Sequence, residues 1–103
     1  MKTLERHAAQ LAALGHPARL GILRYVVRVG PQGVTTTDLQ EKLKIPWTTL
    51  NHHLDRLVAS HLIKARREGR LSLHTADFSA LKGLTDYLWK DCCNLGCNGE
   101  DCC

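Results

Sequence analysis

The first third of the chain places apolar and polar residues at the spacing of two successive helices. Between residues 4 and 14, leucine or alanine recurs every three or four positions, which is typical of one helix face. Gly15 ends this segment, and Pro17 stands where a second helix can begin, because the first helical turn does not need the amide hydrogen that proline lacks. The second helix is apolar around much of its circumference between residues 20 and 29, so we expect it to be central and largely buried.

The middle of the chain has the pattern of two short helices joined by a tight break. Thr37 followed three residues later by Gln40 predicts a capping box that opens the first of them. Residues 44–46 form the break, and the second helix then carries its apolar positions on one side. Two short helices joined in this way are the helix-turn-helix pattern.

The last third predicts a β-hairpin and a final helix. Residues 62–66 and 70–75 flank a Glu-Gly pair, and Leu71 and Leu73 alternate with polar residues. Asp77 or Ser79 is suited to cap a helix with leucines at heptad-like spacing, and we expect the same stripe to continue to Cys92. The expected fold class is therefore mainly α with a small β-hairpin wing, a winged helix-turn-helix of about five helices and two strands.

Length and composition restrict the class of protein. A chain of 103 residues has room for one hydrophobic core, and 44% hydrophobic with 23% charged residues is an ordinary globular composition. Apolar runs stay well short of the roughly 20 residues that a membrane span needs, and polar residues interrupt the N-terminal segment where a signal peptide would be apolar. We therefore expect a cytoplasmic protein without a membrane partner.

The net charge of +4 is unevenly distributed along the chain. Basic residues crowd the middle, at Arg56, Lys64, Arg66, Arg67 and Arg70. Acidic residues gather near the end, at Asp86, Asp91, Glu100 and Asp101. A basic middle suits a phosphate backbone, whereas an acidic end suits a cation or a segment held away from DNA.

The cysteines are confined to the end of the chain. All five lie in the final segment, at Cys92, Cys93, Cys97, Cys102 and Cys103. A disulfide framework would distribute cysteines among the elements that it joins, and an odd count in a reducing compartment argues further against one. We therefore divide the chain into a well-patterned domain at residues 1–91 and a cysteine-rich, ligand-binding tail at residues 92–103.

The second helix of the helix-turn-helix has a polar face that suits DNA. Thr48, His52 and Arg56 are four residues apart and lie opposite the leucine side, with Thr49 and Asn51 flanking them. Hydroxyl, amide and guanidinium groups can bind base edges or phosphates, although an ordinary solvated helix surface is the alternative interpretation.

The hairpin tip supplies a second candidate DNA contact. Arg66, Arg67 and Arg70 are expected to meet phosphate or the minor groove, with a solvated charged turn as the alternative. His53 lies beside the apolar stripe, and we expect it at the edge of the core.

Two stretches carry a resemblance to a known family. Residues 13–23 (ALGHPARLGIL) resemble the entry into the second helix of the ArsR/SmtB repressors. Residues 49–54 (TLNHHL) and 60–63 (SHLI) resemble the recognition helix of that family and its step into the wing. The resemblance implies a winged-helix repressor that binds double-stranded operator DNA as a homodimer, with its first and last helices in the dimer interface.

The chain departs from this family at two of its usual ion sites. Residues 37–43 lack the cysteine pair of many arsenic and cadmium sensors, and residues 78–89 lack the histidines of zinc and nickel sensors. What remains resembles the variant in which an adjacent cysteine pair at the end of the last helix, with one later cysteine, binds arsenite.

Thiolates are soft ligands, and several of them suit a soft ion. Cys92, Cys93 and Cys97 can offer three sulfurs to pyramidal arsenite or antimonite, and two suffice for methylarsenite. Cys102 and Cys103 form a second adjacent pair that can replace Cys97 or bind separately. We therefore expect trivalent arsenic as the inducer, and no organic cofactor.

Several alternatives stay open. Structural zinc usually takes cysteines with residues between them, yet a zinc-, cadmium- or lead-responsive repressor of the same fold is one rival. A redox sensor is another, because Cys93 with Cys102 could form a relaxed disulfide. An enzyme has little support, since the sequence contains no phosphate loop and no paired-carboxylate motif.

Overall fold

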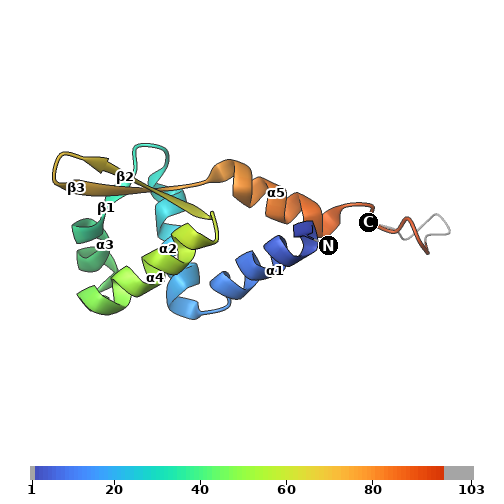
Figure 1. The fold of residues 1–103 in the computed structure, drawn as a ribbon, viewed down its shortest axis with the longest axis horizontal. Coiled ribbons are helices and arrows are strands. Elements are labelled where there is room, and N and C mark those ends of the chain that lie inside the picture. The colour runs from blue at the N-terminus through green and yellow to red at the C-terminus, as the bar shows by residue number, and fades with distance from the viewer. Residues whose placement is uncertain (1, 97–103) are drawn as a thin grey trace.

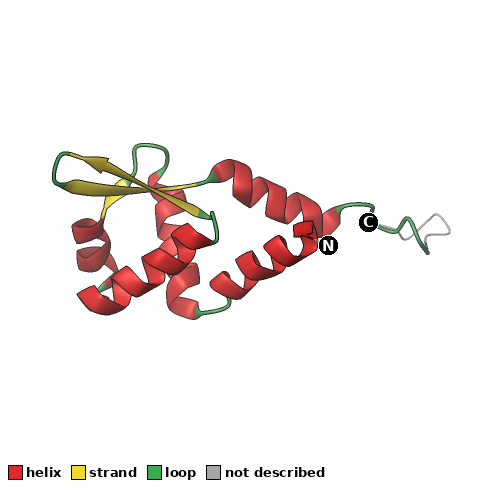
Figure 2. Ribbon diagram, in the orientation of Figure 1, coloured by secondary structure: helices red, strands yellow, loops and turns green. Residues whose placement is uncertain are grey.

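The computed structural model describes residues 2–96 and contains five helices and three strands in that range. In chain order these are α1 (Lys2–Leu14), α2 (Pro17–Val29), β1 (Val34–Thr35), α3 (Thr36–Leu43), α4 (Trp47–Ala59), β2 (Ile63–Glu68), β3 (Leu71–Ala76) and α5 (Phe78–Trp89). The sheet lies along one side of α2, α3 and α4, as Figures 1 and 2 show. The expected winged helix-turn-helix is confirmed, and a short first strand is added to it.

The sheet has the strand order β1-β3-β2, and both pairings are antiparallel. Gly69 takes a φ of +61° in the turn of the hairpin, a backbone region that glycine enters without the usual steric cost. β1 pairs Val34 with His74 and so anchors the start of α3 to the wing. Two residues are too few to show a strand period, which is why the sequence pattern did not reveal β1.

One hydrophobic core joins the central helices to the base of the wing. Its fully buried large side chains are Ile22, Val26, Leu39, Leu50, Leu57, Leu62 and Ile63. α2 is central to this core, as the sequence predicts, although Leu20 on its outer side is 46% exposed. Burying each such side chain contributes about 1.5–3 kcal/mol, so these contacts fix the position of α4.

The cap of α3 differs from the prediction. The Oγ of Thr35, not of Thr37, caps the helix by accepting a hydrogen bond from the backbone N of Asp38 at 3.1 Å. Thr35 is still extended because it belongs to β1, so the helix starts two residues earlier than the predicted capping box. Lys44 then adopts a left-handed φ of 54° and turns the chain toward α4.

The wing buries the face opposite to its leucines. His74 and Ala76 are buried, whereas Leu71 is 54% exposed. The predicted alternation along β3 is therefore present, but the face that carries His74 and Ala76 packs against the body of the protein, and the face that carries Leu71 is turned toward solvent.

The last helix is shorter than predicted. Asp77, one of the two expected caps, accepts a hydrogen bond from the backbone N of Ala80 at 3.0 Å. The helix ends at Trp89, so the expectation that Cys92 continues its stripe is wrong. Lys90 leaves the helical region with ψ near 133°, and the Asp-Cys-Cys-Asn run that follows has low helix propensity.

The two terminal helices converge. α1 and α5 run outward from the central helices and approach each other near the start of α1 (Figure 1). No helix within residues 2–96 is both long and apolar enough to span a membrane.

Candidate nucleic-acid interface and sulfur site

α4 presents one polar face to solvent. Leu50, Leu54 and Leu57 are buried on its inner side, while Thr48 and His52 are exposed on its outer side. Thr49, also predicted to contact DNA, is exposed at the first turn. An exposed helix face of this kind can enter a major groove.

Asn51 differs from its neighbours on α4. Its side chain is half-buried, and its Nδ2 donates a hydrogen bond to the backbone O of Trp47 at 3.1 Å. The amide group is thus already hydrogen-bonded within the helix. To contact a base through its Nδ2, Asn51 must give up the hydrogen bond to Trp47.

Arg56 is exposed, but it lies on the flank of α4 and not at the centre of the outer face. It lines a hollow of about 420 Å³ together with Arg19 of α2 and small residues of α1. Two guanidinium groups beside one hollow suit a phosphate oxygen, because arginine pairs well with phosphate. The geometry favours a backbone contact for Arg56.

His53 lies at the edge of the core, as predicted, and is 5% exposed. Its Nδ1 accepts a hydrogen bond from the Nε of Arg19 at 3.1 Å, and its ring lies 4.9 Å from that of His16. Burial lowers the pKa of His53 most, and the neighbouring charges of His16, Arg19 and His52 lower that pKa further. His53 is therefore a neutral structural acceptor that ties α4 to α2.

The three predicted wing arginines are all exposed, but they do not share one face. Arg66 pairs across the hairpin with Leu73, whereas Arg67 pairs with Ser72 on the side that faces α4. Arg70 lies in the turn, next to Gly69. Of the two arginines in β2, Arg67 is therefore the one on the same side as the recognition helix.

Arg66 already has a partner. Its Nε donates to Oε1 of Glu68 at 3.1 Å, and both side chains are about half exposed. Such a surface ion pair contributes about 0–1 kcal/mol, so DNA can displace it at low cost.

Asp55 is a candidate contact that the sequence analysis missed. It is exposed on the outer side of α4, seven residues after Thr48 and three after His52. It also lines a groove of about 390 Å³ between α4 and the wing, together with Ser72 and His74. The seven-residue spacing from Thr48 could have identified it, because seven residues bring a helix back to the same face.

His74 lies at the inner end of this groove and is 6% exposed. Burial lowers the pKa of His74, against smaller raising effects from a hydrogen bond with the backbone of Val34 and from the charge of Asp55. Its Nδ1 is buried without a hydrogen-bond partner. The ring is therefore held neutral at the base of the wing.

The described part of the sulfur cluster consists of Cys92 and Cys93. Their Sγ atoms lie 3.3 Å apart; Cys92 is exposed and Cys93 is half-buried. Cys92 takes part in a disulfide in this structure. The other predicted ligands, Cys97, Cys102 and Cys103, lie outside the described residues, and within residues 2–96 no three His, Cys, Asp or Glu side chains form a group able to hold a metal ion.

Comparisons with known proteins agree with this geometry. A family model described as a helix-turn-helix domain matches residues 14–66, from the end of α1 to the first strand of the wing. A helix-turn-helix transcriptional regulator of Methanocaldococcus jannaschii is 36% identical over 69 residues, which cover 67% of this chain and 75% of that protein.

Solved structures show the same fold. An ArsR-like transcriptional regulator from Rhodococcus superposes with a TM-score of 0.76 at 24% identity, covering 85% of this chain and 80% of the other. A homodimeric winged helix-turn-helix DNA-binding domain from Mycobacterium bovis gives a TM-score of 0.69 at 24% identity, covering 87% and 83%. The chain therefore belongs to the helix-turn-helix family of transcriptional regulators, and its winged-helix fold is that of the ArsR-like members.

Proposed function

We propose that this chain is a homodimeric cytoplasmic repressor that binds operator DNA and releases it when C-terminal thiolates capture trivalent arsenic. Arsenite, antimonite and methylarsenite are the candidate inducers. Separate observations support the DNA contact, the dimer and the capture of the ion.

The DNA contact is supported by the exposed face of α4 and by the wing. Thr48 and His52 are free of the core and accessible to base edges, and Arg67 lies on the wing face that looks toward them. Arg56 and Arg19 add positive charge at the flank. Phosphate contacts set the register on DNA, and base-edge contacts give the specificity.

The dimer is supported by apolar side chains that the single chain leaves exposed on its terminal helices. On α1, Leu4 and Leu11 are 47% and 44% exposed, and on α5, Leu88 and Trp89 are 59% and 71% exposed. Large exposed apolar groups on adjacent helices are typical of an interface. A single helix-turn-helix also reads few base pairs, so two copies on a palindrome give the needed specificity.

The distance between the two sulfurs is the observation that carries the choice of inducer. The two Sγ atoms lie 3.3 Å apart. If an ion binds both with bonds of about 2.3 Å, the usual zinc–sulfur length, the sulfur–ion–sulfur angle is roughly 90°. A tetrahedral ion such as zinc needs sulfurs roughly 3.8 Å apart for bonds of the same length. This spacing was found with Cys92 in a disulfide, and a reduced pair that keeps it suits a pyramidal ion better than a tetrahedral one.

A redox sensor is the second candidate, and the disulfide at Cys92 favours it. Capture of arsenic requires the reduced thiolate, so oxidation and arsenic would compete for the same sulfur. The two functions can be separated by the conditions of one experiment.

The test compares two double variants, Cys92→Ser with Cys93→Ser, which removes the first pair of sulfurs, and Cys102→Ser with Cys103→Ser, which removes the second. Binding of a labelled operator is measured in excess reductant, with and without arsenite. We expect the first variant to bind the operator with nearly wild-type affinity and to lose the release by arsenite. Release that the second variant keeps assigns the capture to Cys92 and Cys93, and release that it loses adds the second pair to the ligands. Release that persists without Cys92 and Cys93 contradicts the proposal.

A parallel titration replaces arsenite with a thiol oxidant in the absence of reductant. Release by the oxidant alone, with no effect of arsenite on the reduced protein, supports the redox sensor and rejects arsenic as inducer. Loss of operator binding in the sulfur variant before any addition contradicts the separation of the two sites.

A further inference from the structure

Two buried polar side chains on α1 belong neither to the DNA interface nor to the sulfur site. His7 is 7% exposed and Gln10 is 3% exposed. Polar groups are costly to bury unless they are hydrogen-bonded, so their contacts indicate what they do.

Gln10 holds the end of the recognition helix. Its Nε2 donates a hydrogen bond to the backbone O of Ser60 at 3.2 Å, across fifty residues of sequence. Ser60 is the C-cap of α4: its backbone N donates to the O of Arg56 at 3.1 Å, and its Oγ donates to the O of Leu57 at 2.9 Å. Gln10 therefore contacts the residue on which the last turn of α4 closes.

His7 connects Gln10 to the last turn of α5. Its Nδ1 lies 2.9 Å from Oε1 of Gln10, and its ring centre lies 4.5 Å from that of Tyr87 at an interplanar angle of 34°. Because the Nε2 of Gln10 is directed at the Ser60 carbonyl, its Oε1 must accept, so the Nδ1 of His7 carries the hydrogen.

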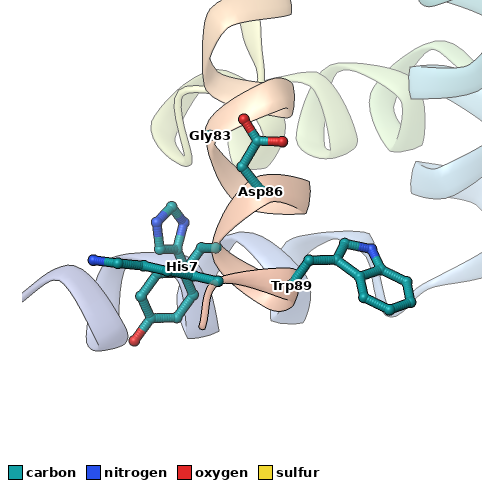
Figure 3. A pocket seen from close by; sticks show the side chains of 6 residues that line it. His7, Gly83, Asp86 and Trp89 are labelled. Atoms are coloured by element: carbon teal, nitrogen blue, oxygen red, sulfur yellow. The ribbon is translucent and has the colours of Figure 1, made fainter. Parts of the chain in front are cut away.

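The His7 ring also borders a cavity at the end of α5. A hollow of about 410 Å³ is lined by His7, Asp86, Tyr87, Trp89 and Lys90, and Figure 3 shows His7 reaching from α1 to the turns that carry Asp86 and Trp89. In the single chain, the last turn of α5 thus borders open space beside the Tyr87 ring that His7 contacts.

We propose that the series Tyr87, His7, Gln10 and Ser60 couples the cysteine end of α5 to the recognition helix, with His7 and Gln10 as positioning residues. The inference rests on the proposed function for its signal, which starts near Cys92, where the backbone N donates to the O of Trp89 at 3.1 Å. A shift of that turn moves Tyr87 against His7, and the amide of Gln10 then loses the orientation that holds Ser60.

The test removes the hydrogen bonds but keeps the volume. Gln10→Met is compared with Gln32→Met, an exposed glutamine of the loop after α2, as the matched control. Operator affinity is measured with and without arsenite in reductant. If arsenite weakens wild-type binding by a factor within the roughly 5- to 150-fold range of allosteric proteins, we expect that factor to fall to about twofold or less in Gln10→Met, with the control unchanged. An unaltered factor in Gln10→Met overturns the inference.

A second readout needs no inducer, so it separates failure of this inference from failure of the proposed function. Linkage is reciprocal: if α5 affects α4, operator binding must affect α5. In a Trp47→Phe background the emission of Trp89 reports on the end of α5. We expect operator DNA to change this emission, and Gln10→Met to abolish the change. No response in the parent, or an equal response in both proteins, contradicts the coupling even if arsenite proves inactive.

His7→Phe breaks the same series at a different residue, so the test does not depend on Gln10→Met folding correctly. The His7→Phe variant keeps a ring against Tyr87 but removes the hydrogen bond to Gln10, and circular dichroism confirms that each variant is folded. If the two residues act in series, the double variant responds to arsenite as either single variant does. Losses that add in the double variant contradict a series.

Discussion

The Nε of Arg19 donates a hydrogen bond to the Nδ1 of His53 at 3.1 Å, which ties the start of α2 to the middle of the recognition helix. The bond requires a deprotonated Nδ1 on His53. His74, at the base of the wing, is likewise buried in its neutral form. Both histidines therefore link the position of a DNA-contacting element to protonation.

Stability should decrease on acidification. The pKa values of His53 and His74 lie below their ordinary value of 6.5 in the folded chain, so below about pH 6.5 the unfolded chain binds more protons. Their stabilising effect is complete above that pH and is lost progressively below it. Urea unfolding between pH 8 and pH 5 measures this. We expect His74→Gln to flatten the dependence, whereas His61→Asn, at an exposed histidine, should leave it unchanged.

Arg56→Ala should weaken operator and non-specific DNA alike. Its place beside Arg19, on the flank of α4, indicates a phosphate contact, so the slope of log affinity against log salt should fall by about 1. Arsenite uptake should not change. Arg24→Ala, at an exposed arginine of α2, is the control. A loss confined to one operator base pair would instead assign Arg56 to base recognition.

Asp55→Asn tests the candidate that the sequence analysis overlooked. A carboxylate on the outer face repels phosphate and can accept a hydrogen bond from the amino group of cytosine. The variant should bind non-specific DNA more tightly and lose about 1–3 kcal/mol of discrimination at one base pair. A panel of single-base operator variants provides the measurement, with Glu5→Gln on α1 as the control. Unchanged discrimination at every position excludes Asp55 from recognition.

Leu88→Glu should separate the protomers. Leu88 is 59% exposed on α5, and a charge there is buried and unpaired if two copies meet at this helix. Sedimentation should show a larger monomer fraction, and operator affinity should fall with it. Leu20→Glu, which alters a leucine 46% exposed on α2, should leave the oligomeric state intact. Equal effects of both variants would show that the terminal helices are not the interface.

The fold was largely readable from the sequence because helix starts and stops carry local chemical signals. Pro17 and Asp77 are both at helix starts as expected. The errors have two causes. Thr35 caps α3 because its place in β1 holds it in an extended conformation, which is a tertiary effect. α5 ends before Cys92 because the residues after Trp89 have low helix propensity, which the spacing of apolar residues does not reveal.

For the candidate site, the sequence predicted which residues are exposed on the recognition helix but not which residues of other elements lie beside them. That Thr48 and His52 are exposed follows from helical periodicity. That Arg56 lies beside Arg19 does not, because it depends on how α4 packs against α2. The contact between Gln10 and Ser60 is equally invisible to local pattern, since fifty residues separate them.

Asp77 has a consequence for how the last helix can move. Its backbone N donates to the O of Leu62 at 2.9 Å and its side chain caps α5, so the root of the wing and the start of the helix share one anchored residue. A tilt of about 10° at this fixed end displaces Trp89 by about 3 Å, because twelve residues at about 1.5 Å each make a lever of about 18 Å. Small rotations about this pivot are therefore magnified at the far tip of the helix, while the wing root stays in place.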